Sequence, residues 1–154
     1  MSEDQLRELV LDLYSARKDI KEYLDFFLDP DVPKLTEKFS KPILKEMSRV
    51  KRGYLATRWL HIRRYLRDYE SFGPGADKVL ELMMTVLHTA VVYERRYYVK
   101  PTFINGTVKL ASDLLKYGDR HLLFDTAVKA VTDATAEASF ALRNPLKDLL
   151  NEIT

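Results

Sequence analysis

Apolar residues recur three and four positions apart along almost the whole chain, which is the spacing of one face of an α-helix. Only five glycines and six prolines interrupt this pattern. The pattern predicts an all-α fold of about seven to eight helices, arranged as a helical bundle or a short superhelical stack. No segment has the composition of a linker, so we expect one all-helical domain over residues 1–154.

The breaks in the pattern give the expected helix boundaries. Ser2 and Gln5 have the spacing of a capping box, which predicts the start of the first helix. Further helices are predicted over residues 18–28, 34–52, 54–72, 77–98, 102–117, 121–140 and from 144 onward. The apolar stripes of the first two helices are expected to face inward, with Leu6, Leu9, Val10, Leu13, Ile20, Tyr23, Leu24 and Phe27 on them.

Two of the predicted helices carry the strongest core signals. Residues 54–72 form one apolar seam, which places the side chain of Trp59 in the core and argues against a base-stacking role for it; the seam consists of Leu55, Trp59, Ile62, Leu66 and Tyr69. Residues 79–93 are apolar or tyrosine at eleven of fifteen positions. We expect that helix to be the centre of the domain or an oligomer contact.

The charge is balanced overall but uneven along the chain. The formal net charge of +2 excludes a uniformly basic nucleic-acid coat protein and an acidic disordered tail. Residues 1–29 hold eight acidic and four basic residues, a balance of −4. Residues 41–67 hold nine basic residues against Glu46 alone, a balance of +8. The segment 41–67 is therefore the first candidate for binding an anionic partner.

Six cations of that segment form the predicted site for an anion or a partner: Lys51, Arg52, Arg58, Arg63, Arg64 and Arg67. Arg63, Arg64 and Arg67 fall opposite the apolar seam at helical spacing, so they make a guanidinium face. Guanidinium groups bind phosphates and carboxylates, which leaves nucleic acid and an acidic protein as alternatives. The third alternative is a solvated face that acidic residues of 1–29 neutralise.

Few residues offer catalytic or metal-binding chemistry. The chain has no cysteine, and its three histidines stand in no metal-binding motif, so we expect no metal and no cofactor. Nucleophile elbows, phosphate-binding glycine loops and dinucleotide fingerprints are also absent from the sequence. Glu81 and His88 lie two helical turns apart on the most apolar helix, which suggests a buried polar pair. The lack of catalytic motifs and of clustered titratable residues favours a protein that is not an enzyme.

The amino-terminal residues and the hydropathy indicate where the protein resides. Met1-Ser2-Glu3-Asp4 lacks the basic start of a secretory signal, and no apolar window is long enough to cross a bilayer. We therefore expect a cytoplasmic protein that does not enter a membrane.

Several segments resemble one protein family. Residues 6–28, with Leu-Arg-Glu-Leu-Val-Leu-Asp-Leu-Tyr at their start, are similar to the opening of an uncharacterised bacterial family of short all-helical proteins, catalogued as a domain of unknown function. The resemblance extends to Phe72-Gly73-Pro74 with the long helix after it, and to residues 111–123; the arginine-rich helix between them matches less well. It implies a bacterial, cytoplasmic, all-α protein and transfers no activity or site.

Together these observations lead to one functional hypothesis and two alternatives. The leading hypothesis is a non-enzymatic protein-interaction module that presents a groove or a basic face to a protein partner, including a second copy of itself. The first alternative is a nucleic-acid-associated protein that contacts phosphates through residues 41–67. The second is an enzyme or small-ligand site around Glu81 and His88, which requires the two side chains to converge on a cavity.

Overall fold

The computed structural model describes residues 1–153, and within that range it contains eight α-helices and one two-stranded sheet. The predicted all-α fold class is confirmed. The chain divides into two compact units, residues 1–35 and 36–154, and each is described by itself. The single domain expected from the sequence stays a prediction. No helix in the described part of the chain has both the length and the apolarity that a membrane span requires.

The first unit contains α1 (Glu3–Ala16) and α2 (Lys18–Leu28), which are joined by Arg17 and contact each other. The predicted capping box is present, since the backbone N–H of Gln5 donates to Ser2 Oγ over 3.2 Å and the backbone N–H of Ser2 donates to Gln5 Oε1 over 2.8 Å. The hydroxyl of Tyr14 donates to Asp25 over 2.7 Å and joins the two helices.

The apolar stripes of α1 and α2 are not buried, which corrects the sequence-based expectation. Neither helix contains a buried residue. Two helices that contact only each other bury little of their apolar surface, so most of each stripe stays accessible to water. Ile20 and Leu24 are half-buried, whereas the exposed members of the predicted stripes are Leu6, Leu9, Val10, Leu13, Tyr23 and Phe27.

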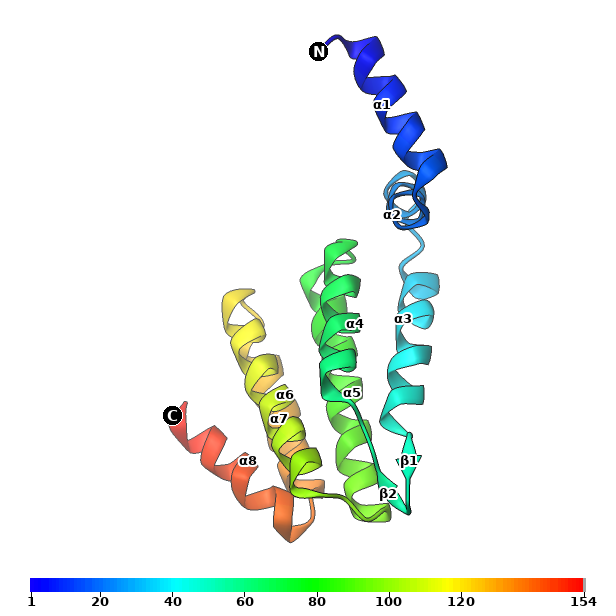
Figure 1. Ribbon diagram of the computed structural model, residues 1–154. Helices are drawn as coiled ribbons and strands as arrows, with labels where there is room; N and C mark the ends of the chain where they lie inside the picture. Colours follow the sequence, from blue (N-terminus) through cyan, green and yellow to red (C-terminus); the bar gives the residue numbers. More distant parts are fainter. Residues whose placement is uncertain (154) are drawn as a thin grey trace. The chain divides into compact units, whose positions relative to one another are not determined.

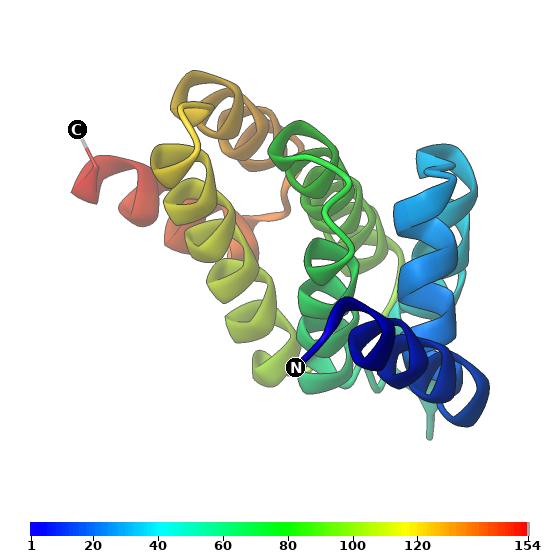
Figure 2. The ribbon, with the colours of Figure 1, turned by 90° about the horizontal axis from the view of Figure 1, so that it is seen from above.

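The second unit begins within α3 (Val32–Met47) and contains the remaining elements (Figure 1). In chain order these are β1 (Val50–Lys51), β2 (Tyr54–Leu55), α4 (Trp59–Ser71), α5 (Ala76–Arg96), α6 (Pro101–Arg120), α7 (Phe124–Glu137) and α8 (Phe140–Glu152). The helices from α4 to α6 alternate in direction, so α4 and α6 run parallel to each other (Figure 1). Seen from above, α8 lies on the side of α6 away from α4 (Figure 2).

Helix α5 is the centre of the second unit. It packs against α4, α6 and α7, and nine of its residues are buried. Of the two roles predicted for residues 79–93, the centre of the domain and an oligomer contact, this position matches the first. The predicted seam of α4 is also confirmed, because Leu55, Trp59, Ile62, Leu66 and Tyr69 are all buried. At the end of α5, buried Glu94 accepts hydrogen bonds from the hydroxyl and the backbone N–H of Ser139, the N-cap residue of α8.

A β-hairpin that the sequence analysis missed separates α3 from α4. Val50 pairs with Leu55 and Lys51 with Tyr54 across a two-residue loop. Both loop residues have positive φ, 54° at Arg52 and 82° at Gly53, which is characteristic of a type I′ turn. Such turns favour Asn-Gly, so Arg-Gly gives little sequence signal for a hairpin. The predicted helices over 34–52 and 54–72 are therefore too long.

Two of the predicted helix boundaries near the C-terminus, the end at residue 117 and the start at residue 144, are also wrong. Gly118 does not break the chain but lies inside α6, where a Cβ atom would come within 2.6 Å of the Cβ of Ala127 on α7. This glycine therefore permits the close packing of two helices. Pro145 does not begin the last helix but stands inside α8, which begins at Phe140.

A second glycine sets the contact between α4 and α6. The indole ring of Trp59 lies against Gly106, and its centroid is 5.7 Å from that of Phe103. A Cβ atom at position 106 would collide with the indole ring. The indole Nε1 is buried and has no hydrogen-bond partner among the described residues, so shape complementarity holds this contact together.

The substitution Gly106→Ala is expected to lower the free energy of unfolding by about 1–3 kcal/mol. Alanine is about 1 kcal/mol more favourable than glycine inside a helix, but the overlap with Trp59 outweighs that gain. The matched control is Asn105→Ala, an exposed position of the same helix, which should not lower stability. Urea denaturation of the three proteins measures the difference, and equal or higher stability of Gly106→Ala would contradict the close contact.

Candidate functional site

The structure distributes the six predicted cations over four places. Lys51 and Arg52 belong to the β-hairpin, and Arg58 immediately precedes α4. Arg63 and Arg67 line a groove on the second unit. Arg64 is exposed on α4 and does not line that groove. The six cations therefore do not form one continuous site.

Arg58 is engaged in an ion pair that shapes the fold. Its guanidinium donates from Nε to Glu46 Oε1 and from Nη2 to Glu46 Oε2, both over 2.8 Å. Its backbone N–H also donates to Glu46 Oε1 over 2.9 Å, so Glu46 caps the start of α4. The Glu46 side chain is only 9% exposed. Arg58 thus joins α3 to α4 and is already paired with a carboxylate.

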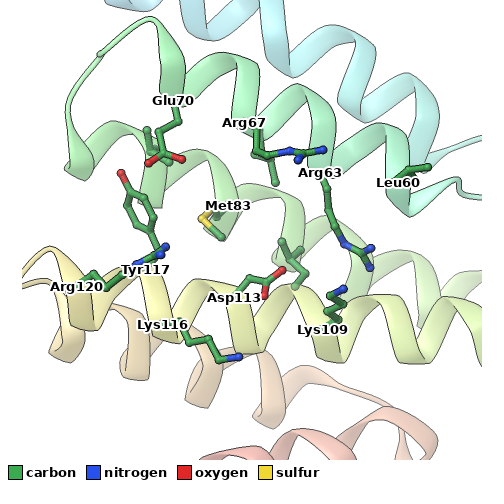
Figure 3. Close-up of a pocket in the computed structure, with 13 residues that line it drawn as sticks. Leu60, Arg63, Arg67, Glu70, Met83, Lys109, Asp113, Lys116, Tyr117 and Arg120 are labelled. Carbon is green, nitrogen blue, oxygen red and sulfur yellow. The ribbon is translucent and has the colours of Figure 1, made fainter.

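The groove lies between the parallel helices α4 and α6, and α5 forms its floor (Figure 3). It has a volume of about 510 Å³ and is open to solvent. Its floor and walls are apolar, formed by Leu60, Leu66, Val79, Met83, Leu110 and the ring of Tyr117. This surface can accept the apolar side chains of a partner.

The rim of the groove is basic. Two carboxylates, Glu70 and Asp113, oppose five cations, so the lining carries a formal charge of +3; the cations are Arg63, Arg67, Lys109, Lys116 and Arg120. None of these five cations forms an ion pair within residues 1–153. Arg63 and Lys109 lie at one end of the groove and Arg120 at the other (Figure 3). The arrangement suits a ligand that is apolar on one side and anionic at its edges.

Tyr117 lies at the end of the groove where the carboxylate of Glu70 and the guanidinium of Arg120 are both present. Burial raises the pKa of its hydroxyl, and the carboxylates of Glu70 and Asp77 add to the rise, whereas Arg120 opposes it. The Arg120 guanidinium lies 5.8 Å from the centre of the Tyr117 ring. Glu70 and Tyr117 point toward each other across the groove (Figure 3). At neutral pH this end therefore presents a phenol O–H group beside a carboxylate.

Sequence reasoning missed the half of the rim that α6 provides. Lys109, Lys116 and Arg120 are scattered through a segment of balanced charge, so no local excess marked them. Their helical spacing with Asp113 was the available signal, since positions 109, 113, 116 and 120 share one helix face. Only the parallel packing of α4 and α6 brings this face opposite Arg63 and Arg67.

The proposed buried polar pair of Glu81 and His88 is corrected by the structure. The side chains are 68% and 66% exposed, and they pair with other residues. Glu81 lies 3.4 Å from Lys78 Nζ, and His88 Nδ1 lies 3.6 Å from Glu137. Both positions fall on the narrow polar face of α5, whose remaining faces are covered by α4, α6 and α7. The two side chains do not converge on a common cavity, and no group of metal-ligating side chains occurs within residues 1–153.

Comparison of the chain with family models, curated proteins and solved structures gives no match. The resemblance to a bacterial family therefore stays a prediction, and the function has to be argued from the groove and the surface.

The Glu46–Arg58 pair generates a pH-dependent prediction. The guanidinium of Arg58 holds the pKa of the Glu46 carboxyl below its usual value. A carboxyl whose pKa is lower in the folded state stabilises the fold at pH values above its unfolded pKa, and the contribution disappears as the pH falls through the folded pKa. Glu46→Gln should therefore cost about 1–2 kcal/mol at pH 7, and the difference from wild type should shrink below about pH 4.

Thermal unfolding at a series of pH values measures this difference. Glu37→Gln is the matched control on the same helix, because Glu37 and its partner Lys41 are both well exposed and their pair should contribute no measurable stability. A constant difference between Glu46→Gln and wild type from pH 7 to pH 3 would contradict the proposed role of the charge.

Proposed function

We propose that this chain is a non-enzymatic protein-interaction module whose groove holds an acidic amphipathic helix of a protein partner. The observation that carries the proposal is the combination of an apolar floor with a rim of five cations that form no ion pair within residues 1–153. A helix that lays its apolar face into a groove is a recurring mode of recognition, in which anchors at helical spacing fill the floor. Carboxylates beside those anchors would then meet the guanidinium and ammonium groups of the rim.

The geometry of the groove supports an elongated ligand. Its lining follows α4 from Leu60 to Glu70 and α6 from Lys109 to Arg120, so each wall extends over about three helical turns. The cations stand along both walls, which allows carboxylates on both edges of a bound helix to be paired. The charge excess would speed association and select against basic partners, and contact with the apolar floor would add to the affinity.

The first test measures binding of a labelled synthetic peptide by fluorescence anisotropy. The peptide carries leucine at helical spacing and glutamate at the flanking positions, and its counterpart replaces every glutamate with lysine. The intact protein should bind the glutamate peptide and not the lysine peptide. Arg63→Glu/Lys109→Glu should weaken binding about tenfold or more, because the two reversed charges lie on opposite walls.

The control for this test is Lys129→Glu/Lys147→Glu, which changes the net charge equally outside the groove. This variant should bind the glutamate peptide as the wild type does. The proposal is wrong if the intact protein fails to bind the glutamate peptide, if both peptides bind equally, or if the control variant loses as much affinity as the groove variant.

A second copy of the chain is a protein partner with the required chemistry. Helix α1 carries an exposed apolar stripe that includes Leu6 and Leu9, and its acidic residues are Glu3, Asp4, Glu8 and Asp12. The unit that contains it has nine acidic and five basic residues, a balance of −4. We therefore include a homodimer, in which the groove of one copy holds α1 of another, in the proposal.

Sedimentation velocity tests the homodimer with two charge-reversed proteins. Arg63→Glu/Lys109→Glu alone and Glu8→Lys/Asp12→Lys alone should each be monomeric at micromolar concentrations, because groove and helix then repel each other. An equimolar mixture should contain dimers, since each groove meets a helix of opposite charge from the other protein. A monomeric wild type, or a mixture that stays monomeric, would exclude the homodimer and leave the peptide test as the measure of the groove.

A further inference from the structure

A second exposed cluster lies on the β-hairpin and contains none of the residues that line the groove. It consists of Lys51, Arg52 and Tyr54 from residues 50–55 and of Tyr98 and Lys100 from the connection between α5 and α6; we call it the hairpin cluster. All five residues are exposed, and Tyr98 is 80% exposed. A tyrosine that leaves most of its ring in water at a defined position is unusual, because aromatic rings normally bury most of their surface.

Backbone pairing brings the two tyrosines and the first lysine together. Lys51 is directly opposite Tyr54 in the hairpin, so the two side chains share one face. Tyr54 also forms a parallel bridge with Tyr98, and the backbone N–H of Leu55 donates to the Tyr98 carbonyl over 3.1 Å. The centres of the two tyrosine rings are 6.4 Å apart, and the rings are arranged edge to face. The backbone from which the two exposed rings project is therefore held in place before any ligand arrives.

Two lysines lie beside the aromatic pair. The Lys100 ammonium lies 5.3 Å from the centre of the Tyr54 ring, and Lys51 stands on the same face of the hairpin. None of Lys51, Arg52 and Lys100 forms an ion pair within the described residues 1–153. The cluster therefore carries a formal charge of +3 with no carboxylate bound to it.

Arg52 occupies a backbone conformation that arginine rarely adopts. Its φ of 54° lies in the left-handed region, where glycine or asparagine is favoured and other residues carry a cost of about 1–2 kcal/mol. No hydrogen bond or ion pair of its side chain within residues 1–153 offsets that cost. Strained residues of this kind concentrate at binding sites, where the side chain is needed at the tip of a turn.

We propose that the hairpin cluster binds single-stranded nucleic acid. Bases would stack on the exposed face of Tyr98, and successive phosphates would meet Lys51, Arg52 and Lys100. Single-strand binding combines aromatic rings with cations, and the hairpin cluster offers both. Stacking on the rings requires bases that are not paired in a duplex. The proposal goes beyond the protein-binding groove, because it uses none of the groove residues and stands or falls independently of them.

Fluorescence anisotropy of a labelled oligothymidylate of about 12 nucleotides tests this site on the intact protein over a series of salt concentrations. Binding by three cations should give a slope of about −2 in a plot of log K against log salt, since each phosphate contact to a single strand contributes about −0.7. A duplex of the same length should bind more weakly, because its bases are stacked on each other.

Substitutions separate stacking from charge. Tyr98→Ala should weaken binding about tenfold and leave the salt slope unchanged, whereas Tyr98→Phe should retain wild-type affinity. Lys100→Ala should reduce the magnitude of the slope by about 0.7. Because Tyr98 is exposed, Tyr98→Ala should unfold at the wild-type temperature, which circular dichroism checks.

Four results would overturn the assignment of this site. They are an absence of binding at low salt, equal affinity for the duplex, wild-type affinity of Tyr98→Ala, and loss of oligonucleotide binding in Arg63→Glu/Lys109→Glu. The last result would move the nucleic acid to the groove. The hairpin cluster is supported if the groove variant binds the oligonucleotide normally and Tyr98→Ala binds the glutamate peptide normally.

Discussion

The packing of the Trp59 indole against Gly106 is the contact on which the groove depends. It brings the beginning of α4 against the first half of α6 at a distance that only glycine permits. From that point the two helices run in the same direction, each packed against α5, and the space between them becomes the groove. The indole Nε1 has no partner within residues 1–153, so apolar packing here outweighs the cost of a buried donor.

A second constraint fixes where α4 begins. Glu46 holds both the guanidinium and the backbone N–H of Arg58, so the last turns of α3 determine the position of the first turn of α4. The cost of removing Glu46 from water is balanced by three hydrogen bonds, two of them from a charged group. Arg58, which the sequence suggested as part of a binding face, therefore stabilises the fold. By fixing the start of α4, it also positions Arg63 and Arg67 along the groove.

The groove and the hairpin cluster divide the basic residues into two surfaces with different chemistry. The groove combines cations with aliphatic side chains and suits an amphipathic helix, whereas the cluster combines cations with exposed aromatic rings and suits unpaired bases. Both surfaces join segments that are distant in the sequence: α4 with α6 in the first, and residues 50–55 with residues 97–100 in the second. Positive charges of residues 41–67 are therefore divided between the two surfaces.

The sequence by itself determined the helices, the buried seam of α4 and the central place of α5, because helical spacing of apolar residues is a local signal that packing then satisfies. It could not show that α1 and α2 stay unburied, that Arg-Gly closes a hairpin, or that Gly118 packs rather than breaks. These outcomes depend on which elements become neighbours. The same holds for the candidate site, since only tertiary packing placed the cations of α6 opposite those of α4 and left Glu81 and His88 facing water.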